Sequence, residues 1–381
     1  MDTGTARPDP IGFSAGKASA VLERHGIDLL IASTPVNVFY ATGMPTLHVA
    51  PNPILYVLSN QFPTLAMIRG DGAECAFTWM VYQSTNRWTW VEDVTGTLSP
   101  KQTLEEICSK IQAWGLSEKT IGLESLMPRY QAEFIRERFP QAKIVDGDRA
   151  FLDMRLVKTE EETSRIRKST EIAEKAILAV IDAAREGVTD NELLRVARRT
   201  IVEEGAEGWD HLTMGLGSSD PEAPGLGYVV NKGQINRIDI GVVYKGYVSD
   251  ISREFVVGEP PAGAREHMDM MIKAQEYLEA HVKPGVRIKE LYKEAKNFAK
   301  SLSRVAMIYM TAHSIGLECE EVHLFSPMRT LDVAFEEGMV VDIEVWKTFK
   351  EFNLVGVEDC YRVTGSGVER LSSLDKGIYV R

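Results

Sequence analysis

The chain has 381 residues, of which 44% are hydrophobic, and a formal net charge of −12 at pH 7. This length allows two domains, each with a buried core. The negative charge argues against a nucleic-acid partner or an anionic membrane surface, because both attract basic proteins.

The four cysteines are far apart in the sequence and form no CxxC pair, which is typical of free thiols in a reducing compartment. The first residues lack the basic segment and the apolar core of a secretory signal. No apolar run approaches the ~18 residues of a membrane-spanning helix. We therefore expect a cytoplasmic protein with neither a membrane nor a nucleic-acid partner.

Helices and strands alternate in the N-terminal part of the sequence. Helices are expected at 14–25, 103–114 and 129–138, and strands at 28–33, 54–58, 64–68, 75–80, 120–123 and 143–145. A turn is expected at Thr34-Pro35. This alternation predicts a three-layer α/β domain. The sequence has neither a G-x-G-x-x-G motif after a strand nor a P-loop, so nothing indicates nucleotide binding.

The pattern changes near Lys158, where a long charged and apolar helix is predicted over 159–185. We place the domain boundary just before it, with an N-terminal domain at 1–157 and a C-terminal domain at 158–381.

The C-terminal half contains an internal repeat. The segment 187–193 ends one predicted helix and begins the next, with Thr189 and Glu192 spaced as a capping box, and the segment 285–291 resembles it. The segments 239–242 and 342–345 form a second matching pair. These similarities predict a duplicated helix-helix-strand-strand unit, with a pseudo-twofold axis that can place a site between the copies.

Residues 237–258 predict a β-hairpin. Two β-rich runs flank Lys245-Gly246, and a glycine there can adopt the positive φ of a tight turn. If Tyr244 pairs with Tyr247, the register of the whole hairpin follows.

In that register Asp239 lies opposite Ser252, and Asp250 is a diagonal neighbour of Asp239 on the same face of the sheet. Two carboxylates this close repel each other unless a cation lies between them, and a metal ion is the simplest such cation. A solvated strand face or a turn cap is the alternative for an isolated pair of aspartates.

Three further candidate ligands follow: His313, Glu344 and Glu358. A second hairpin, turning near Glu351, would bring Glu344 opposite Glu358. Singly, a loop histidine, an edge-strand carboxylate and a salt-bridge partner are the alternatives. Together with the two aspartates they supply four carboxylates and one imidazole. This set suits two divalent ions, and Mn, Co, Fe and Zn all remain open.

These motifs resemble the pita-bread metallopeptidases, the family of prolidase, aminopeptidase P, methionine aminopeptidase and creatinase. The run Asp239-Ile-Gly…Tyr244-x-Gly-Tyr-x-Ser-Asp250-Ile-Ser-Arg resembles the prolidase signature. The segments around His313, Glu344 and Glu358 are similar to the family's later ligand motifs, and Asn37-Val-Phe-Tyr40-x-Thr-Gly43 resembles its N-terminal domain. The resemblance implies an α+β chain, with a creatinase/prolidase-type N-terminal domain before a pita-bread catalytic domain.

The resemblance also implies roles. Asp239 would bind one metal, His313 and Glu344 the other, and Asp250 and Glu358 would bridge both. A metal-bound water would attack the amide bond of a dipeptide or another small molecule, with Glu344 as proton shuttle. The resemblance further implies a homodimer, in which His48 and nearby aromatic residues reach the partner's site, although a structural role is equally open for them.

Three departures from the family pattern concern substrate binding. Glu320 stands where peptidases of the family carry a second histidine, no histidine occurs at 225–228, and Gly356 replaces an arginine of prolidases. His211 lies too far upstream to replace the missing histidine. Each lost hydrogen-bond donor to developing charge costs about 10²–10³ in rate.

The departures favour an alternative, a non-peptidase member of the fold. Glu320 resembles the acid of dimethylsulfoniopropionate lyases and would act as the base, or would steer a cationic metabolite. Trp346 would then form a cation–π wall, with plain packing as the alternative. His323 would supply a proton donor near Glu320, with a surface position as the alternative. A binding module without activity is a third hypothesis, disfavoured because all five ligand positions are retained.

Overall fold

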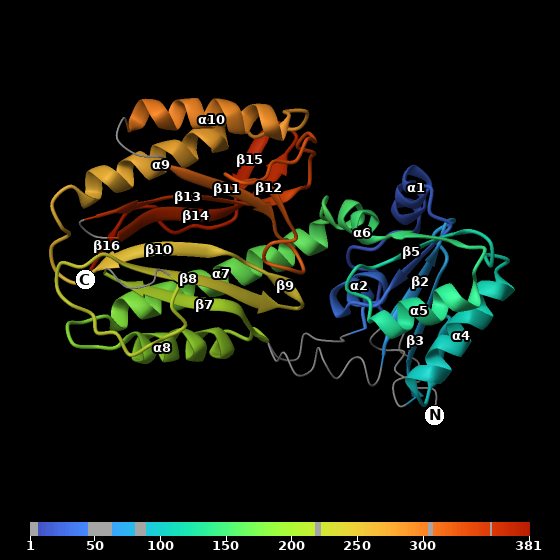
Figure 1. Cartoon of the computed structure of the whole chain (residues 1–381). Helices are drawn as coiled ribbons and strands as arrows, with labels where there is room; N and C mark the ends of the chain where they lie inside the picture. Colours follow the sequence, from blue (N-terminus) through green and yellow to red (C-terminus); the bar gives the residue numbers. More distant parts are fainter. Residues whose placement is uncertain (1–6, 45–62, 81–88, 218–221, 304–307, 351–352) are drawn as a thin grey trace. The chain divides into compact units, whose positions relative to one another are not determined.

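The computed structural model describes residues 7–44, 63–80, 89–217, 222–303, 308–350 and 353–381 (Figure 1). The chain divides into two compact units, Met1–Leu156 and Val157–Arg381. The strand predicted at 54–58 and His48 lie outside the described residues.

The first unit is built on a mixed sheet. Within its described part, six strands have the order β4-β3-β2-β1-β5-β6. The strands are β1 Leu29–Ala32, β2 Leu65–Arg69, β3 Glu74–Trp79, β4 Val94–Thr97, β5 Thr120–Leu123 and β6 Lys143–Asp146. The helices are α1 Ala15–His25, α2 Pro35–Thr42, α4 Pro100–Ala113, α5 Arg129–Arg138 and α6 Asp148–Arg155. The predicted elements of this region that lie within the described residues are therefore confirmed, apart from the segment after β1.

The turn predicted at Thr34-Pro35 is wrong, because α2 begins there. The Thr34 side chain accepts a hydrogen bond from the Asn37 N–H, and Pro35 occupies the first helical position. Threonine is a favourable N-cap, and proline at this position loses no hydrogen bond. The same residues that predict a turn therefore start a helix.

Helices cover both faces of this sheet. Leu29 and Ile31 share one buried cluster with residues of α4 and α5. Leu30 points to the opposite face, because side chains alternate along a strand. The described residues of α2 are absent from that cluster, and α2 contacts β1 and β2. The unit thus has the three-layer arrangement that the sequence predicts.

The second unit contains two helix pairs on one curved sheet. The helices are α7 Glu160–Ala183, α8 Asp190–Glu203, α9 Ala264–His281 and α10 Ile288–Leu302. The strands are β7 Gly208–Leu216, β8 Asn236–Tyr244, β9 Tyr247–Val248, β10 Ile251–Val256, β11 Tyr309–Ser314, β12 Val322–Phe325, β13 Val340–Phe349, β14 Asn353–Thr364, β15 Gly367–Arg370 and β16 Tyr379–Val380. Among the described residues the main strand order is β12-β11-β13-β14-β10-β8-β7.

The predicted duplication is confirmed by this arrangement. The helices α7 and α8 lie beside β8 and β7, and α9 lies beside β13 and β14 (Figure 1). The capping box at the start of α8 is present, since the Thr189 side chain accepts from the Glu192 N–H and the Glu192 side chain accepts from the Thr189 N–H. Arg287, at the corresponding start of α10, makes no side-chain cap.

One face of the second sheet is covered by helices. Ile238, Ile240 and Val242 of β8 share a buried cluster with residues of α7 and α8. Arg237 and Asp239, which alternate with these residues along β8, therefore face the other side of the sheet.

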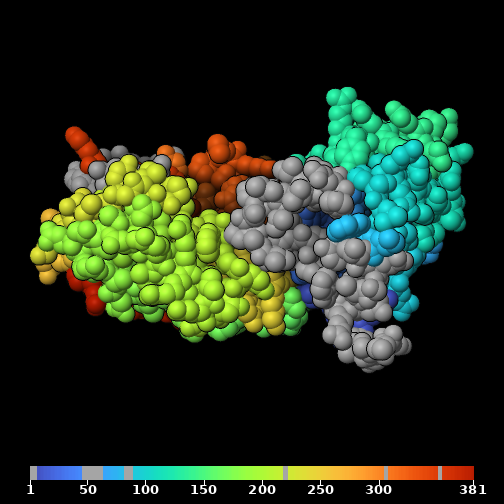
Figure 2. Space-filling view, turned by 90° about the horizontal axis from the view of Figure 1, so that it is seen from below, coloured from blue at the N-terminus to red at the C-terminus, as the bar shows by residue number. Residues whose placement is uncertain are grey.

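The outer surface of α8 faces solvent, and its yellow-green atoms are seen from below in Figure 2. No helix in the described part of the chain combines the length and the apolar composition needed to cross a membrane. All four cysteines belong to the described residues, and each is a free thiol, as the sequence predicts.

Candidate metal centre

The central row of the site runs across neighbouring strands of the second sheet. Both predicted hairpin registers are confirmed, since Tyr244 pairs with Tyr247 and Glu344 pairs with Glu358. Direct cross-strand partners form one row on the face away from the helices, namely Asp239, Ser252, Glu358, Glu344 and Thr311. A row of this kind places side chains within about 5 Å of one another.

Two further rows flank the central one. On one side the partners are Cys360, Asp342, His313 and His323. On the other side Arg237 pairs with Glu254, and Gly356 pairs with Trp346, which pairs with Tyr309. Strands far apart in the sequence thus bring acidic, basic and aromatic groups onto one face.

The five predicted ligands come together in this face. Ligand atoms of Asp250, His313 and Glu358 all lie within 4.8 Å of one another. The His313 Nε2 atom is 3.6 Å from Asp250 Oδ2. Asp239 and Glu344 lie beside these residues, and both contact the Arg237 guanidinium.

Burial raises the pKa of three carboxyl groups in the site. It raises the pKa of Glu344 to about 7, and it raises the pKa of Glu358 well above its ordinary value, with further contributions from neighbouring carboxylates. Burial also raises the pKa of Asp342 well above its ordinary value, aided by Cys360 and Glu358. These buried acids take up protons when no cation is available, because like charges in a low dielectric cannot all remain ionised.

Asp239 shows the opposite behaviour. Burial alone would raise the pKa of this carboxyl, but Arg237 and His211 outweigh burial and hold the pKa below its ordinary value. Asp239 is therefore ionised at neutral pH, with two protein cations beside it.

Arg237 places its guanidinium inside the carboxylate cluster. The Nη2 atom lies 2.9 Å from Asp239 Oδ2, 2.8 Å from Glu344 Oε1 and 3.2 Å from Glu358 Oε2. The side chain is only 3% exposed. Its Nη1 atom lies 4.0 Å from Glu254 Oε1, on the residue directly across the ladder. The sequence motifs indicated no role for Arg237 or Glu254.

His211 also reaches the cluster, from a β-bulge in β7. The pairing of β7 with β8 shifts between Trp209 and His211, leaving Asp210 as the extra residue. The His211 Nε2 atom lies 3.2 Å from Asp239 Oδ1 and 3.2 Å from Asp250 Oδ1. The bulge therefore brings His211 to the site. Its distance from Asp239 along the sequence had argued against such a position.

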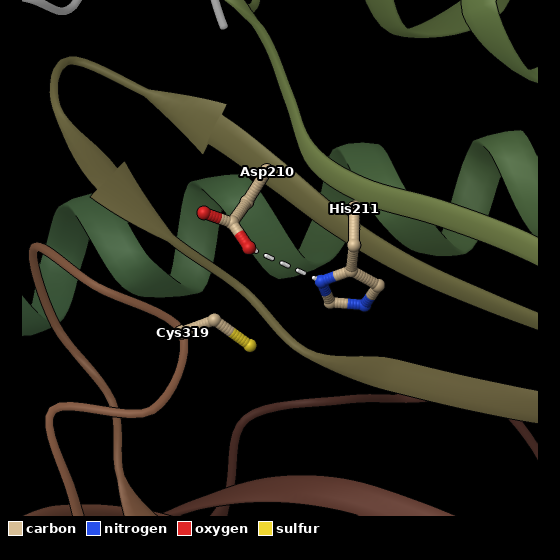
Figure 3. A group of neighbouring side chains, drawn as sticks. All are labelled: Asp210, His211 and Cys319. Carbon is tan, nitrogen blue, oxygen red and sulfur yellow. Dashed lines mark hydrogen bonds and ion pairs between the residues drawn. The ribbon is translucent and has the colours of Figure 1, made fainter. Parts of the chain in front are cut away.

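Figure 3 shows His211 with its neighbour Asp210. The Asp210 Oδ2 atom lies 3.4 Å from His211 Nδ1, the ring nitrogen that does not contact Asp239. Burial by itself would lower the pKa of His211, but Asp250, Asp210 and Asp239 raise it well above its ordinary value. The imidazole is thus a cation at neutral pH.

Cys319, the third residue in Figure 3, donates a hydrogen bond from Sγ to Asp250 Oδ2 at 2.9 Å. Burial, followed by the charge of Asp250, raises the pKa of the Cys319 thiol well above its usual range. A protonated thiol is a donor to the carboxylate and not a metal ligand.

Glu320 and His323 lie at the edge of the site. His323 Nε2 is 3.0 Å from Glu320 Oε2, and the two side chains are 38% and 55% exposed. The His323 ring lies 6.2 Å from the His313 ring, measured between centroids. His323 is thus a cross-strand neighbour of a candidate ligand, whereas Glu320 extends toward solvent.

Trp346 stacks on Tyr309, with ring centroids 4.3 Å apart and an angle of 11° between the planes. A Cβ atom at Gly356 would lie 2.6 Å from the Trp346 Cβ. The same Cβ would lie 3.0 Å from the Val345 carbonyl oxygen, so no side chain fits at position 356 unless this strand pair moves.

Comparison with known proteins assigns the family. The profile of metallopeptidase family M24 matches residues 164–365, and that of the creatinase/prolidase N-terminal domain matches residues 16–157. The first match alone spans more than half of the chain. The chain belongs to metallopeptidase family M24.

Two relatives align with most of the length of the chain. It is 26% identical over 359 residues to the Xaa-Pro dipeptidase of Pyrococcus furiosus, covering 93% of this chain and 96% of the relative. It is 27% identical over 336 residues to the Xaa-Pro dipeptidase of Pyrococcus horikoshii, covering 86% and 92%.

Solved structures show the same fold. The X-Pro aminopeptidase from Thermotoga maritima superposes with a TM-score of 0.78 at 23% identity, covering 97% of this chain and 99% of that one. The prolidase from Pyrococcus horikoshii OT3 superposes with a TM-score of 0.78 at 23% identity, covering 95% and 98%. The predicted fold, an α+β chain with a creatinase/prolidase-type domain before a pita-bread domain, is confirmed.

Membership in the M24 family implies divalent metal cofactors, and part of the site fits them. Asp250, His313 and Glu358 offer oxygen and imidazole ligands of the kind that Mn, Fe, Co and Zn accept. Among the described residues, the buried Asp342 Oδ1 has no hydrogen-bond partner, and it lies 3.8 Å from His313 Nε2. The other part, around Asp239, already holds the guanidinium of Arg237.

Four residues of this M24 site were missed at the sequence level: Arg237, Glu254, Asp342 and His211. Three of them could have been found from their spacing in the sequence. Arg237, Glu254 and Asp342 each stand two residues from a residue that faces the site, namely Asp239, Ser252 and Glu344. A spacing of two places side chains on the same face of a strand. His211 carried no such signal, because a bulge changes the alternation.

Proposed function

We propose that the chain is a metal-dependent peptidase that hydrolyses dipeptides of the Xaa-Pro type. One observation carries the proposal: Asp239, Asp250, His313, Glu344 and Glu358 converge on one face of the sheet, at the positions that the family signature predicts. Family membership supports metal-dependent peptide hydrolysis, and relatives aligned over nearly the whole chain are Xaa-Pro dipeptidases.

In this proposal Asp250, His313 and Glu358 hold a divalent ion, chosen by availability from Mn, Co, Fe and Zn. Such an ion lowers the pKa of a bound water and polarises a carbonyl group. The thiol of Cys319 fixes the orientation of the Asp250 carboxylate through its hydrogen bond. His211 and Arg237 hold Asp239 in its ionised form.

Glu344 is the proposed proton carrier. Its side chain is 19% exposed, more than those of Asp239 at 11% and Glu358 at 5%. Its Oε2 atom accepts a hydrogen bond from Thr311 Oγ1 at 3.2 Å, which fixes the carboxyl. A fixed carboxyl that borders the open side can take a proton from water and deliver it to a leaving amine.

The comparisons do not favour the alternative, a non-peptidase reaction with Glu320 as base. Glu320 is exposed, and in the described residues its ion pair is with His323 and not with the carboxylate cluster. His323 is the better placed of the two to approach a substrate bound beside His313.

Hydrolysis of Xaa-Pro dipeptides in the presence of Mn²⁺ or Co²⁺ tests the proposal. Xaa-Pro substrates should be cleaved in preference to Xaa-Ala dipeptides, and a chelator should abolish turnover. His313→Ala should lose activity together with bound metal. Absence of turnover across a dipeptide panel, with metal verified in the protein, would exclude this function.

Three further expectations accompany the proposal. We propose a homodimer in a cytoplasmic location, supported by the family resemblance, and a domain boundary between residues 157 and 158. Light scattering after size-exclusion chromatography measures the mass in solution. Expression of residues 158–381 alone, followed by calorimetry, tests whether that part folds independently.

A further inference from the structure

The guanidinium of Arg237 occupies a point that is nearly equidistant from three carboxylate oxygens. The distances from Nη2 to Asp239 Oδ2, Glu344 Oε1 and Glu358 Oε2 lie between 2.8 and 3.2 Å. The family resemblance assigns Asp239 to one metal ion, Glu344 to the other and Glu358 to both. The Arg237 guanidinium is therefore a cation that lies between these three carboxylates.

A metal ion cannot share this point with Arg237. Divalent ions lie about 2.0–2.6 Å from carboxylate oxygens. An ion bound by these three oxygens would thus overlap the Nη2 atom. The two cations exclude each other, unless the arginine leaves the site.

Several contacts hold Arg237 in place. The side chain is 3% exposed, and Glu254, directly across the ladder, is fully buried. Glu254 accepts a hydrogen bond from the Gly356 N–H at 3.2 Å, which fixes the carboxyl beside Arg237. Moving the guanidinium out would leave the buried Glu254 carboxyl without the cation that now lies 4.0 Å away.

The second oxygen of Asp239 is engaged as well. Its Oδ1 atom lies 3.2 Å from His211 Nε2, while its Oδ2 atom faces Arg237. Both oxygens of this predicted ligand therefore already have a contact within the chain, one with the Arg237 guanidinium and one with the His211 ring.

The other end of the site remains suited to an ion. His313 Nε2 lies 3.6 Å from Asp250 Oδ2 and 3.8 Å from Asp342 Oδ1. Donor atoms around one ion at about 2.0–2.3 Å are spaced roughly 3–4 Å apart. In the described residues Arg237 contacts this group only at Glu358 Oε2, 3.2 Å away. His211 Nε2 lies 3.2 Å from Asp250 Oδ1, the Cys319 thiol donates to Asp250 Oδ2, and the buried Asp342 Oδ1 has no hydrogen-bond partner within the described part of the chain.

We propose that Arg237 permanently replaces one of the two metal ions, so that the chain binds a single divalent ion at Asp250, His313 and Glu358. The inference rests on the proposed function, because it assumes that the site binds a divalent ion. It makes Arg237 and Glu254 a unit that fixes the metal content of the enzyme.

Metal stoichiometry tests the inference without reference to activity. The full-length protein is stripped with a chelator, reloaded with Mn²⁺ and freed of unbound ion, and manganese per chain is measured by mass spectrometry. Wild type should bind one ion per chain. The double variant Arg237→Leu with Glu254→Gln removes the guanidinium and the acid across the ladder together, and it should bind twice as much manganese. Arg362→Leu is the matched control, since Arg362 lies in the same sheet but pairs with Glu160, 2.9 Å away at the surface.

Electron paramagnetic resonance of Mn²⁺-loaded wild type gives an answer even if the double variant does not fold. A spectrum of isolated Mn²⁺ is expected, and the signal of an exchange-coupled pair would overturn the inference. Two tightly bound ions in wild type, or an unchanged single ion in a folded double variant, would do the same.

The outcomes also separate this inference from the proposed function. One bound ion without dipeptide cleavage would remove the peptidase proposal and leave the role of Arg237 intact. Cleavage of Xaa-Pro dipeptides with two ions bound per chain would keep the function and overturn the inference. A protein that retains no ion overturns both.

Discussion

Replacing Gly241 with alanine would place a methyl group where the His211 ring lies. A Cβ atom at this position would be 2.5 Å from His211 Cε1, 2.6 Å from its Nδ1 and 3.0 Å from the Ser249 carbonyl oxygen. Ordinary contacts of a Cβ atom begin near 3.4 Å, so the ring must move by about 1 Å. We predict that Gly241→Ala displaces His211 from the carboxylate cluster.

The cost follows from the contacts that this movement breaks. The ring is 3.2 Å from both Asp239 Oδ1 and Asp250 Oδ1, and a shift of about 1 Å weakens both ion pairs steeply. The side chain is 25% exposed, so the ring can tilt toward solvent and avoid the full cost of overpacking. We expect a loss of about 1–3 kcal/mol in the free energy of unfolding.

Calorimetry of four proteins measures this effect: wild type, Gly241→Ala, His211→Ala and the double variant. For a unit the size of Val157–Arg381, 1 kcal/mol corresponds to about 2–4 °C, so Gly241→Ala should lower the midpoint by roughly 2–12 °C. In the His211→Ala background the same change should cost much less, because only the Ser249 contact remains. Equal shifts in both backgrounds would refute the reasoning.

Three other predictions concern residues outside the carboxylate cluster. Lys158→Met should lower stability by about 3–5 kcal/mol, because Lys158 Nζ lies 2.7 Å from Glu321 Oε2 and both side chains are 1% exposed; adding Glu321→Gln should restore most of the melting temperature. Glu320→Ala should change Xaa-Pro turnover by no more than about five-fold, since exposed ion pairs contribute about 0–1 kcal/mol; loss of turnover with metal content unchanged would give Glu320 a catalytic role. Burial raises the pKa of Glu74 to about 8 from 4.5, so its contribution to stability is complete below pH 4.5 and is lost as pH rises toward 8. Glu74→Gln should flatten this loss of about 2–4 kcal/mol in pH-dependent unfolding, and an unchanged pH profile would count against it.

Much of the site followed from strand periodicity. The pairing of Tyr244 with Tyr247 and the position of Asp239 opposite Ser252 could be counted from the turn at Lys245-Gly246. Such counting works because a tight hairpin fixes the register and side chains alternate with a period of two. The turn at Thr34-Pro35 failed, because the same two residue types also start helices.

The same periodicity did not predict what fills the space between the carboxylates. The sequence requires a cation between Asp239 and Asp250, and a metal ion is the simplest one. Only the tertiary structure shows that a guanidinium already lies beside Asp239, donated by a residue two positions away. Glu254, the acid across the ladder from Arg237, lies on another strand.

Short motifs and local hydrogen-bonding patterns were sufficient to predict the family, the two-part fold and five candidate ligands. The tertiary structure decided how the charges of the site are balanced. That balance depends on side chains from β7, β8, β10, β13 and β14 meeting in one buried volume. Which cation neutralises which carboxylate is a matter of distances of about 3 Å across strands, and no local pattern encodes such distances.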